Sequence, residues 1–294
     1  MPHLCTVGLV LLAMGPTEEP EPEHARNPVY TAVLTEGLTV GGATIRPPGP
    51  TFRDGQSADE QRAALRALAG SERAVGELLR DSVSAPFLLK LHDEKAEGAT
   101  LRAGDLYFIL HVELDTIDPA ELFRTTERGS VEAGNMRFEV RWLGADDLRG
   151  GPAEVPGRAE WYVHTTGRLL DRIAVEATSH LTSSRSADSI VVAARTDRRF
   201  DDDDRWPNRW RPLERRRDSE RPGPAHAYTG GIGYTKISRL RGVPKAVIVE
   251  AHFAFAEPRA WFDGAPILRS KLSLIAQDQI RRLRRELAGE PKGR

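Results

Sequence analysis

Two histidine–carboxylate pairs have the residue types and spacing that suit chemistry. His111 and Glu113 lie two positions apart, as do Glu250 and His252, in segments that read as strands. Alternate residues of a strand face the same way, so each pair shares one face. If the two strands were neighbours, these groups could bind a metal ion or act as an acid–base pair. The alternative is a set of unconnected, half-buried histidines spread over a sheet: His111, His164, His180 and His252.

Other chemical motifs are weaker. The run 201–204 is four aspartates, but it lacks the glycine and the alternating ligands of a calcium loop, so we expect a solvated loop. The next residues interleave arginines with Trp206 and Trp210, as nucleic-acid surfaces do, but the aspartates beside them would repel phosphate. The glycines at 230, 231 and 233 open no helix, and Ser183-Ser184 lacks elbow glycines. We therefore expect no catalytic residue, no metal and no other cofactor.

Composition excludes several classes of function. The chain has 294 residues, a hydrophobic fraction of 39% and a net charge of -1, so no bulk field favours nucleic acid. Its one cysteine, Cys5, lies in an apolar leader. The mature chain would then have no disulfide, no zinc–thiolate site and no cysteine nucleophile.

The first residues predict an exported protein. The apolar run 4–14 is shorter than the roughly 20 residues that span a bilayer, and it suits a signal peptide covering 1–15. The alternatives are a buried N-terminal strand or a wrongly chosen start, which would leave the protein cytoplasmic. Residues 16–28 are acidic and rich in proline, so we expect an extended linker. The expected location is periplasmic or extracellular, with no transmembrane segment in the mature chain.

The stretch 246–287 is the most strongly patterned. Val247, Val249, Ala251, Phe253 and Phe255 alternate with a mixed face, which predicts a strand over 246–255. A turn follows over 256–264. The helix predicted over 266–287 carries an apolar stripe, an early proline and an arginine-rich end: Leu268, Leu272, Ile275, Leu283 and Leu287 with Pro266 and Arg281, Arg282, Arg284 and Arg285.

The remaining patterns predict strands bracketed by helices. A capping box at Ser57 and Glu60 begins a helix to about 68, and a shorter helix covers 72–80. A short helix is expected from 118 to about 123. Strands are expected at 29–35, 38–45, 85–91, 105–114, 136–143, 160–165, 171–181, 189–196, 211–214 and 228–240. This order predicts one α+β domain over 29–288, built on a curved antiparallel sheet, with a disordered tail at 289–294.

The chain resembles the helix-grip fold of START lipid-transfer domains. The likeness lies in the strand ending at Phe255, the turn Pro258-Arg259-Ala260-Trp261-Phe262 and the arginine-rich final helix, and upstream in the strand 189–196. The resemblance implies a sheet wrapped around the C-terminal helix, with a cavity between them for a lipid or other apolar molecule. Facing and position suggest that this cavity is lined by Glu250, His252, Trp261, Leu272 and Ile275.

The sequence supports three hypotheses of function. The first is an exported, non-catalytic module that binds a hydrophobic small molecule. The second is an envelope structural or interaction protein with the same fold, a filled core and no ligand. The third is an enzyme that uses the strand histidines, which predicts either a metal ion bound to the purified protein or contact between His111 and His252.

Overall fold

A single large antiparallel sheet organises the structure. The computed structural model describes residues 21–120, 131–132, 136–148, 159–216 and 219–287. The spatial order of the main strands is β3 (Leu88–Ala96), β4 (Ala99–Leu110), β14 (Val247–Pro258), β13 (Gly231–Arg239), β9 (Ser189–Thr196), β8 (Ile173–Arg185), β7 (Ala159–Leu169), β6 (Met136–Leu143) and β5 (Val131–Glu132). Strand β10 (Arg209–Arg216) pairs with β8. It also pairs with β11 (Ser219–Pro222) and β12 (His226–Ala227). The predicted α+β class with a curved antiparallel sheet is confirmed.

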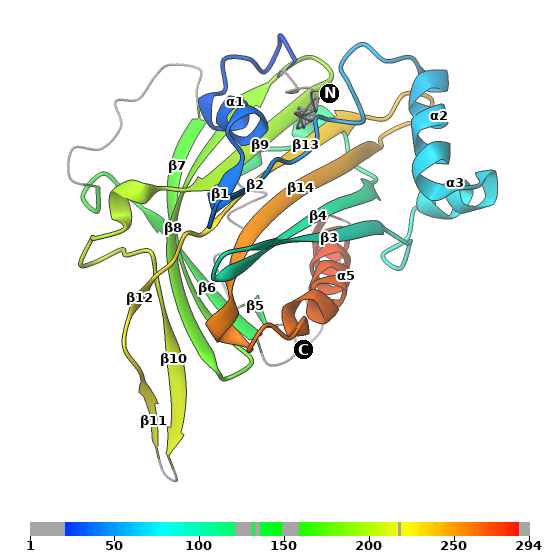
Figure 1. The fold of residues 1–294 in the computed structure, drawn as a ribbon. Coiled ribbons are helices and arrows are strands. Elements are labelled where there is room, and N and C mark those ends of the chain that lie inside the picture. Colours follow the sequence, from blue (N-terminus) through cyan, green and yellow to red (C-terminus); the bar gives the residue numbers. More distant parts are fainter. Residues whose placement is uncertain (1–20, 121–130, 133–135, 149–158, 217–218, 288–294) are drawn as a thin grey trace, which may run out of the picture.

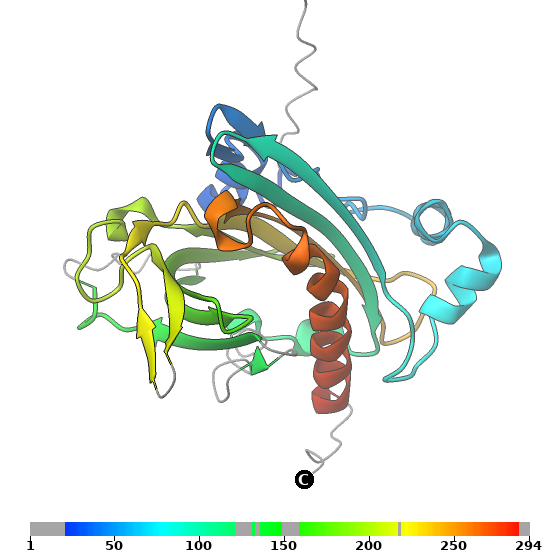
Figure 2. The same ribbon diagram turned by 60° about the horizontal axis from the view of Figure 1, so that its bottom comes forward.

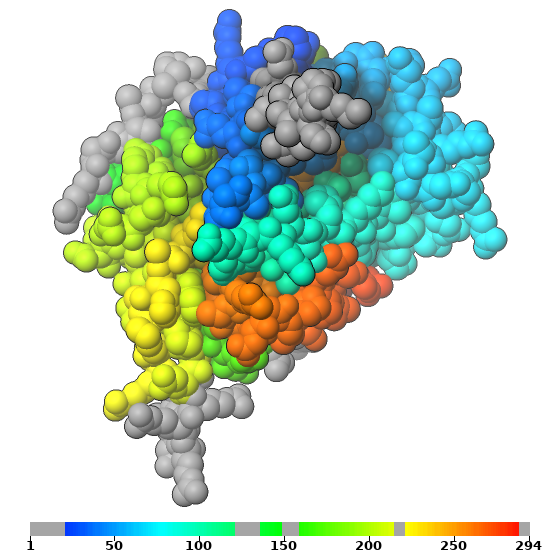
Figure 3. All heavy atoms as spheres, viewed as in Figure 1, coloured from blue at the N-terminus to red at the C-terminus, as the bar shows by residue number. Residues whose placement is uncertain are grey.

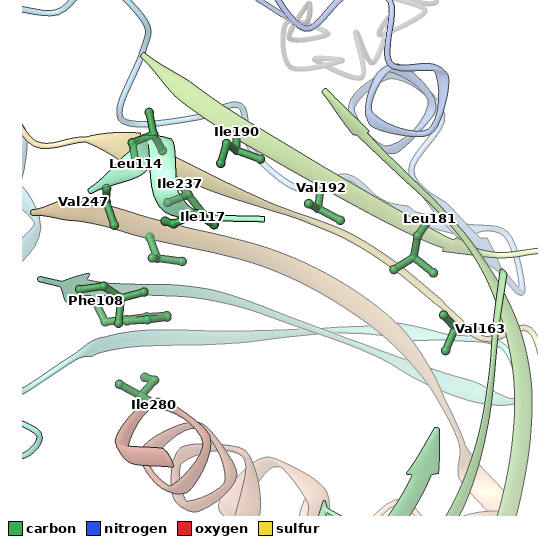
Figure 4. Close-up of a cluster of buried hydrophobic side chains, with 12 residues drawn as sticks. Phe108, Leu114, Ile117, Val163, Leu181, Ile190, Val192, Ile237, Val247 and Ile280 are labelled. Carbon is green, nitrogen blue, oxygen red and sulfur yellow. The ribbon is translucent and has the colours of Figure 1, made fainter. Parts of the chain in front are cut away.

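The C-terminal helix α5 (Ile267–Leu287) lies in the concavity of this sheet (Figures 1 and 2). At one end of the concavity, Ile280 of the helix packs with buried residues of several strands, among them Phe108, Val192 and Ile237 (Figure 4). At the other end, Leu268 packs with Met136, Trp261 and further apolar residues. Most of the apolar stripe predicted for this helix therefore faces the sheet, as expected, but Leu287 at its end is 41% exposed.

The N-terminal part of the chain covers the opposite, convex face. Helix α1 (Pro28–Thr35) packs on β9, β13 and β8, and the hairpin of β1 (Leu38–Val40) and β2 (Ala43–Ile45) lies beside β14 and β3. Helices α2 (Ala58–Ala69) and α3 (Glu72–Leu78) follow at one end of the sheet (Figure 1). On the molecular surface, β3 and β4 separate this N-terminal segment from the C-terminal one (Figure 3). Three short 3-10 helices complete the described elements: η1 (Leu114–Thr116), η2 (Arg198–Phe200) and η3 (Arg259–Trp261).

The strand predicted over 29–35 is wrong, because this segment is helix α1. The Asn27 side chain accepts a hydrogen bond from the Tyr30 backbone N–H, and Pro28 occupies the first helical position. The buried residues are 29, 30, 33 and 34, which lie on one side of a helix and on both sides of a strand. Packing against the sheet thus outweighs the β-branched residues of this segment.

Two further expectations for the N-terminal region need correction. The strand predicted over 38–45 is broken into a hairpin by Gly41 and Gly42, whose φ angles are 50° and 79°. From residue 21 onward, the expected linker packs on the sheet instead of extending into solvent, and the His24 side chain is fully buried. Residues 1–20, the second half of the helix predicted over 118–123 and the tail 289–294 lie outside the described ranges.

Other predictions are confirmed. Ser57 and Glu60 form the capping box that begins α2, and β9 spans the predicted residues 189–196. The predicted C-terminal strand and helix agree with β14 and α5 to within three residues. Among the helices of the described ranges, none is both long enough and apolar enough to cross a membrane.

Candidate functional site

A cavity of about 530 Å³ lies between the concave face of the sheet and α5. It exists because the middle of that face carries small residues. Ala177 on β8, Ala194 on β9, Gly233 on β13 and Ala251 on β14 all line it, whereas bulky residues fill the concavity on both sides of this band. Small side chains cannot reach across to the helix, so the space stays open.

Strand register assembles this band of small residues. Gly233 pairs with Ala194 on one side and with Phe253 on the other, and the next concave residue of β13, Thr235, pairs with Ala251. Phe253 turns its ring over Gly104 of β4, where an added Cβ would lie 2.5 Å from a ring carbon. The absence of a side chain at Gly104 therefore leaves room for the Phe253 ring.

The roof of the cavity comes from α5 and the turn before it. Leu268, Leu272 and Ile275 line the cavity from the helix, and Trp261 lines it from η3. The Trp261 side chain is only 2% exposed, and its ring centroid lies 5.4 Å from that of Tyr228. Four of the five residues predicted to line the cavity are thus among its lining residues: His252, Trp261, Leu272 and Ile275.

Arginines fix α5 at both ends. Near its start, Arg269 pairs with Asp93, which also pairs with Arg102. Arg102 in turn holds Glu257 in a bidentate pair, with N–O distances of 2.8 and 2.9 Å. Near its end, the buried Arg284 guanidinium donates to the backbone carbonyls of residues 85 and 109. Polar contacts outside the cavity therefore hold the helix in place over the cavity.

Glu250 does not line the cavity. Its carboxylate lies on the convex face, where it accepts hydrogen bonds from the backbone N–H groups of Thr51, at 2.8 Å, and Phe52, at 3.1 Å. The carboxylate is fully buried. It therefore holds the N-terminal segment against the sheet, and the prediction that placed it in the cavity is wrong.

His252 contributes to the cavity wall, but its ring lies on the convex face. Its Nδ1 lies 2.7 Å from an oxygen of Asp105, and its Nε2 lies 3.4 Å from Glu250. The ring also contacts Tyr234. Burial lowers the pKa of His252, but the hydrogen bonds to the two carboxylates and their charges outweigh burial, so its net pKa is raised. The ring is therefore part of a buried ionic cluster and is turned away from the cavity.

A second polar cluster lies on the convex face and was not predicted from the sequence. The Lys236 ammonium, 0% exposed, pairs with Glu21 and lies 3.0 Å from Asp54. His24 lies beside them, and burial, followed by the charge of Lys236, lowers its pKa to about 4. Glu21, His24 and Asp54 offer three potential metal-ligand atoms within 4.8 Å of one another, but the Lys236 ammonium already supplies their cation. This cluster was not predicted because the acidic, proline-rich composition around Glu21 and His24 indicates a linker.

The strand histidines do not form one site. Leu110 pairs with Val247 and Asp105 pairs with His252, so His111 and His252 lie about 20 Å apart along the strands. The other two histidines lie on the distant strands β7 and β8. His164 hydrogen-bonds Thr178, and His180 Nε2 lies 2.5 Å from Glu160. The contact between His111 and His252 that would support the enzyme hypothesis is absent from the described structure.

Comparison with known proteins gives no assignment. No protein-family model matches the chain, and no curated protein matches its sequence. The architecture, a large antiparallel sheet holding a C-terminal helix in its concavity, is compatible with a helix-grip fold.

Proposed function

We propose that this protein is a non-catalytic, START-like module that binds a hydrophobic small molecule or lipid between the sheet and α5. The cavity carries this proposal. Its volume of about 530 Å³ falls within the roughly 300–1,000 Å³ of small-molecule pockets, and most of its lining side chains are apolar. The short apolar run at 4–14 supports export as part of the same proposal.

A cavity of this size favours ligand binding over a filled-core interaction protein. Well-packed interiors contain few voids larger than a water molecule, because each void forfeits dispersion contacts. Here the small residues of four neighbouring strands converge on one space, and the helix over that space is fixed at its ends. A binding site accounts for this arrangement, because the ligand would supply the missing contacts.

The first test is native mass spectrometry on residues 17–294, combined with organic extraction of the purified protein. We expect a stoichiometric apolar molecule, whose mass would identify its class. A bare polypeptide mass, with no molecule in the extract, would favour the interaction module and direct the search to protein partners.

The second test blocks the cavity from the helix. We expect Leu272→Trp to abolish uptake of the neutral fluorescent probe N-phenyl-1-naphthylamine, because the indole would occupy the ligand's space. The matched control is Leu274→Trp, which adds the same side chain at a position that is 57% exposed on the same helix. Ile275→Trp repeats the test on the next lining residue. Unchanged uptake in both cavity variants would refute the assignment of the site.

A further inference from the structure

The wall of the cavity carries hydroxyl groups that the protein leaves without hydrogen bonds. Thr165 of β7, Ser179 of β8 and Thr235 of β13 line the cavity, as does Tyr228 just before β13. Within the described part of the chain, no hydrogen bond from or to these four hydroxyls is found. The hydroxyl of Thr196, which also lines the cavity, differs because it accepts from the Gly231 backbone N–H.

These hydroxyls occupy two different parts of the cavity. Ser179 pairs with Thr196 across β8 and β9, and Thr165 pairs with Ala177, so these groups lie in the middle of the floor. Tyr228 lies at the end near the roof, beside Trp261. Burial, followed by the charge of Glu257, raises the pKa of the Tyr228 phenol further above neutral pH, so the group is a neutral hydrogen-bond donor there. A ligand that fills the cavity thus meets polar groups at its middle and at one end.

Charge is missing from the same wall. Among the lining residues in the described ranges, none is an aspartate, glutamate, lysine or arginine, and the ring of the lining His252 is turned to the convex face. The buried pair of Arg102 and Glu257 is satisfied internally. A charged group on an enclosed ligand would therefore meet no counter-ion, which is costly in a low-dielectric site.

We propose that the enclosed part of the ligand is uncharged and carries hydroxyl or carbonyl oxygens that pair with Thr165, Ser179, Tyr228 and Thr235. This inference rests on the proposed function and narrows it. A pure hydrocarbon would leave the four hydroxyls without hydrogen bonds. An anionic lipid head or a fatty-acid carboxylate would be buried without a counter-ion. A largely apolar molecule with uncharged oxygens would form hydrogen bonds with the hydroxyls and would bury no unpaired charge.

Three compounds with the same fused-ring skeleton test this proposal: naphthalene, 2-naphthol and 2-naphthoate, each competing with N-phenyl-1-naphthylamine at pH 7. In the wild-type protein we expect 2-naphthoate to bind at least about tenfold more weakly than 2-naphthol, because its charge is buried. In the variant Thr165→Val/Ser179→Ala/Tyr228→Phe/Thr235→Val, the affinity of 2-naphthol relative to naphthalene should fall by about tenfold, because its oxygen loses its partners. The control Thr39→Val removes an exposed hydroxyl outside the cavity and should leave the ratio unchanged.

The outcomes separate this inference from the proposed function. If the probe binds but the ratio of 2-naphthol to naphthalene is the same in wild type and variant, the hydroxyl assignment is overturned. If 2-naphthoate binds as tightly as 2-naphthol, the requirement for an uncharged ligand is overturned. If neither the probe nor any of the three compounds binds the wild type, the proposed function itself fails. Should the fourfold variant not fold, Tyr228→Phe and Ser179→Ala alone should each lower the ratio by about threefold.

Discussion

Replacing Lys236 by methionine tests whether its buried ammonium holds the N-terminal segment on the sheet. Methionine keeps most of the length of the side chain and removes its charge. The wild-type ammonium lies between the carboxylates of Glu21 and Asp54, whose side chains are 11% and 8% exposed. The substitution therefore leaves two nearly buried anions without their cation.

The expected cost follows from this burial. Removing one partner of a buried ion pair costs about 3–5 kcal/mol, because the remaining charge has no counter-ion. Hydrogen bonds from Ser186 and Ser189 still reach Asp54, and methionine is easier to bury than an ammonium, so we expect the lower end, about 3 kcal/mol. For a chain of this length, this corresponds to a Tm lower by about 6–12 °C.

The assay is urea unfolding at pH 7, followed by tryptophan fluorescence. The matched control is Lys95→Met, on the exposed side of edge strand β3, which should change the free energy of unfolding by no more than about 0.5 kcal/mol. The triple variant Glu21→Gln/Asp54→Asn/Lys236→Met should regain much of the lost stability, because no unpaired charge remains. A Lys236→Met protein within about 1 kcal/mol of wild type would refute the reasoning.

The ion pair of Lys236 and Asp54 also predicts that the free energy of unfolding depends on pH. Burial raises the pKa of Asp54, but hydrogen bonds from Ser186 and Ser189 and the charge of Lys236 outweigh it, so the pKa lies below 3.8. A lowered carboxyl pKa contributes stability above its unfolded value, and this stability is lost as the pH falls through the folded value. The difference between wild type and Lys236→Met should therefore be largest near neutral pH and shrink below about pH 4. A constant difference would contradict this account.

Three further predictions concern other buried polar contacts. A chain that begins at Val29 should be less stable in urea than one that begins at Thr17, because it lacks the buried residues before α1; equal stability would contradict their role. The raised pKa of His252 contributes stability below pH 6.5 that is lost as the pH rises through the folded value, so wild type should weaken above that pH and His252→Gln should show no such decline. Arg284→Met should lower stability by about 2–3 kcal/mol by removing donors to buried carbonyls, while Arg285→Met, at an exposed position, should be neutral.

The fold was predictable where one face of an element is apolar over its whole length. The strand and helix at 246–287 alternate with periods of 2 and 3.6, so the structure differs from the prediction by only a few residues. Helix α1 was not predictable in this way. Its eight residues hold too few turns to show a period, and Asn27 and Pro28 define its start only once the segment packs on the sheet.

Of the residues that line the cavity, those of the roof were predictable from the sequence and those of the floor were not. Leu272 and Ile275 belong to a visible helical stripe, and Trp261 follows from the turn. The middle of the floor carries mainly alanines, glycines and small hydroxyl residues on five strands, β7, β8, β9, β13 and β14. In sequence, a small residue that leaves a void looks the same as one that allows close packing.

The mixed face of β14 was misread for a related reason. Glu250 and His252 were predicted to line the cavity because they share the mixed face of a strand that precedes the C-terminal helix. Their partners are Thr51, Phe52 and Asp105, and the first two lie almost 200 positions earlier in the chain. Nothing local to the strand indicates that a distant segment covers this face, so the alternation along the strand was predictable, but which of its two faces lines the cavity was not.

The position of β14 in the middle of the sheet constrains how the chain can assemble. β14 lies between β4 and β13, and Val247 pairs with Leu110, about 140 positions earlier. During synthesis, β4 can pair with β14 only after almost the whole chain has left the ribosome. The concave face of β7, β8 and β9 stays uncovered until α5 follows. Contacts between such distant segments slow folding, and exposed apolar faces promote aggregation meanwhile. Nascent chains that stop before residue 247 would therefore depend on chaperones in a way that the finished protein does not.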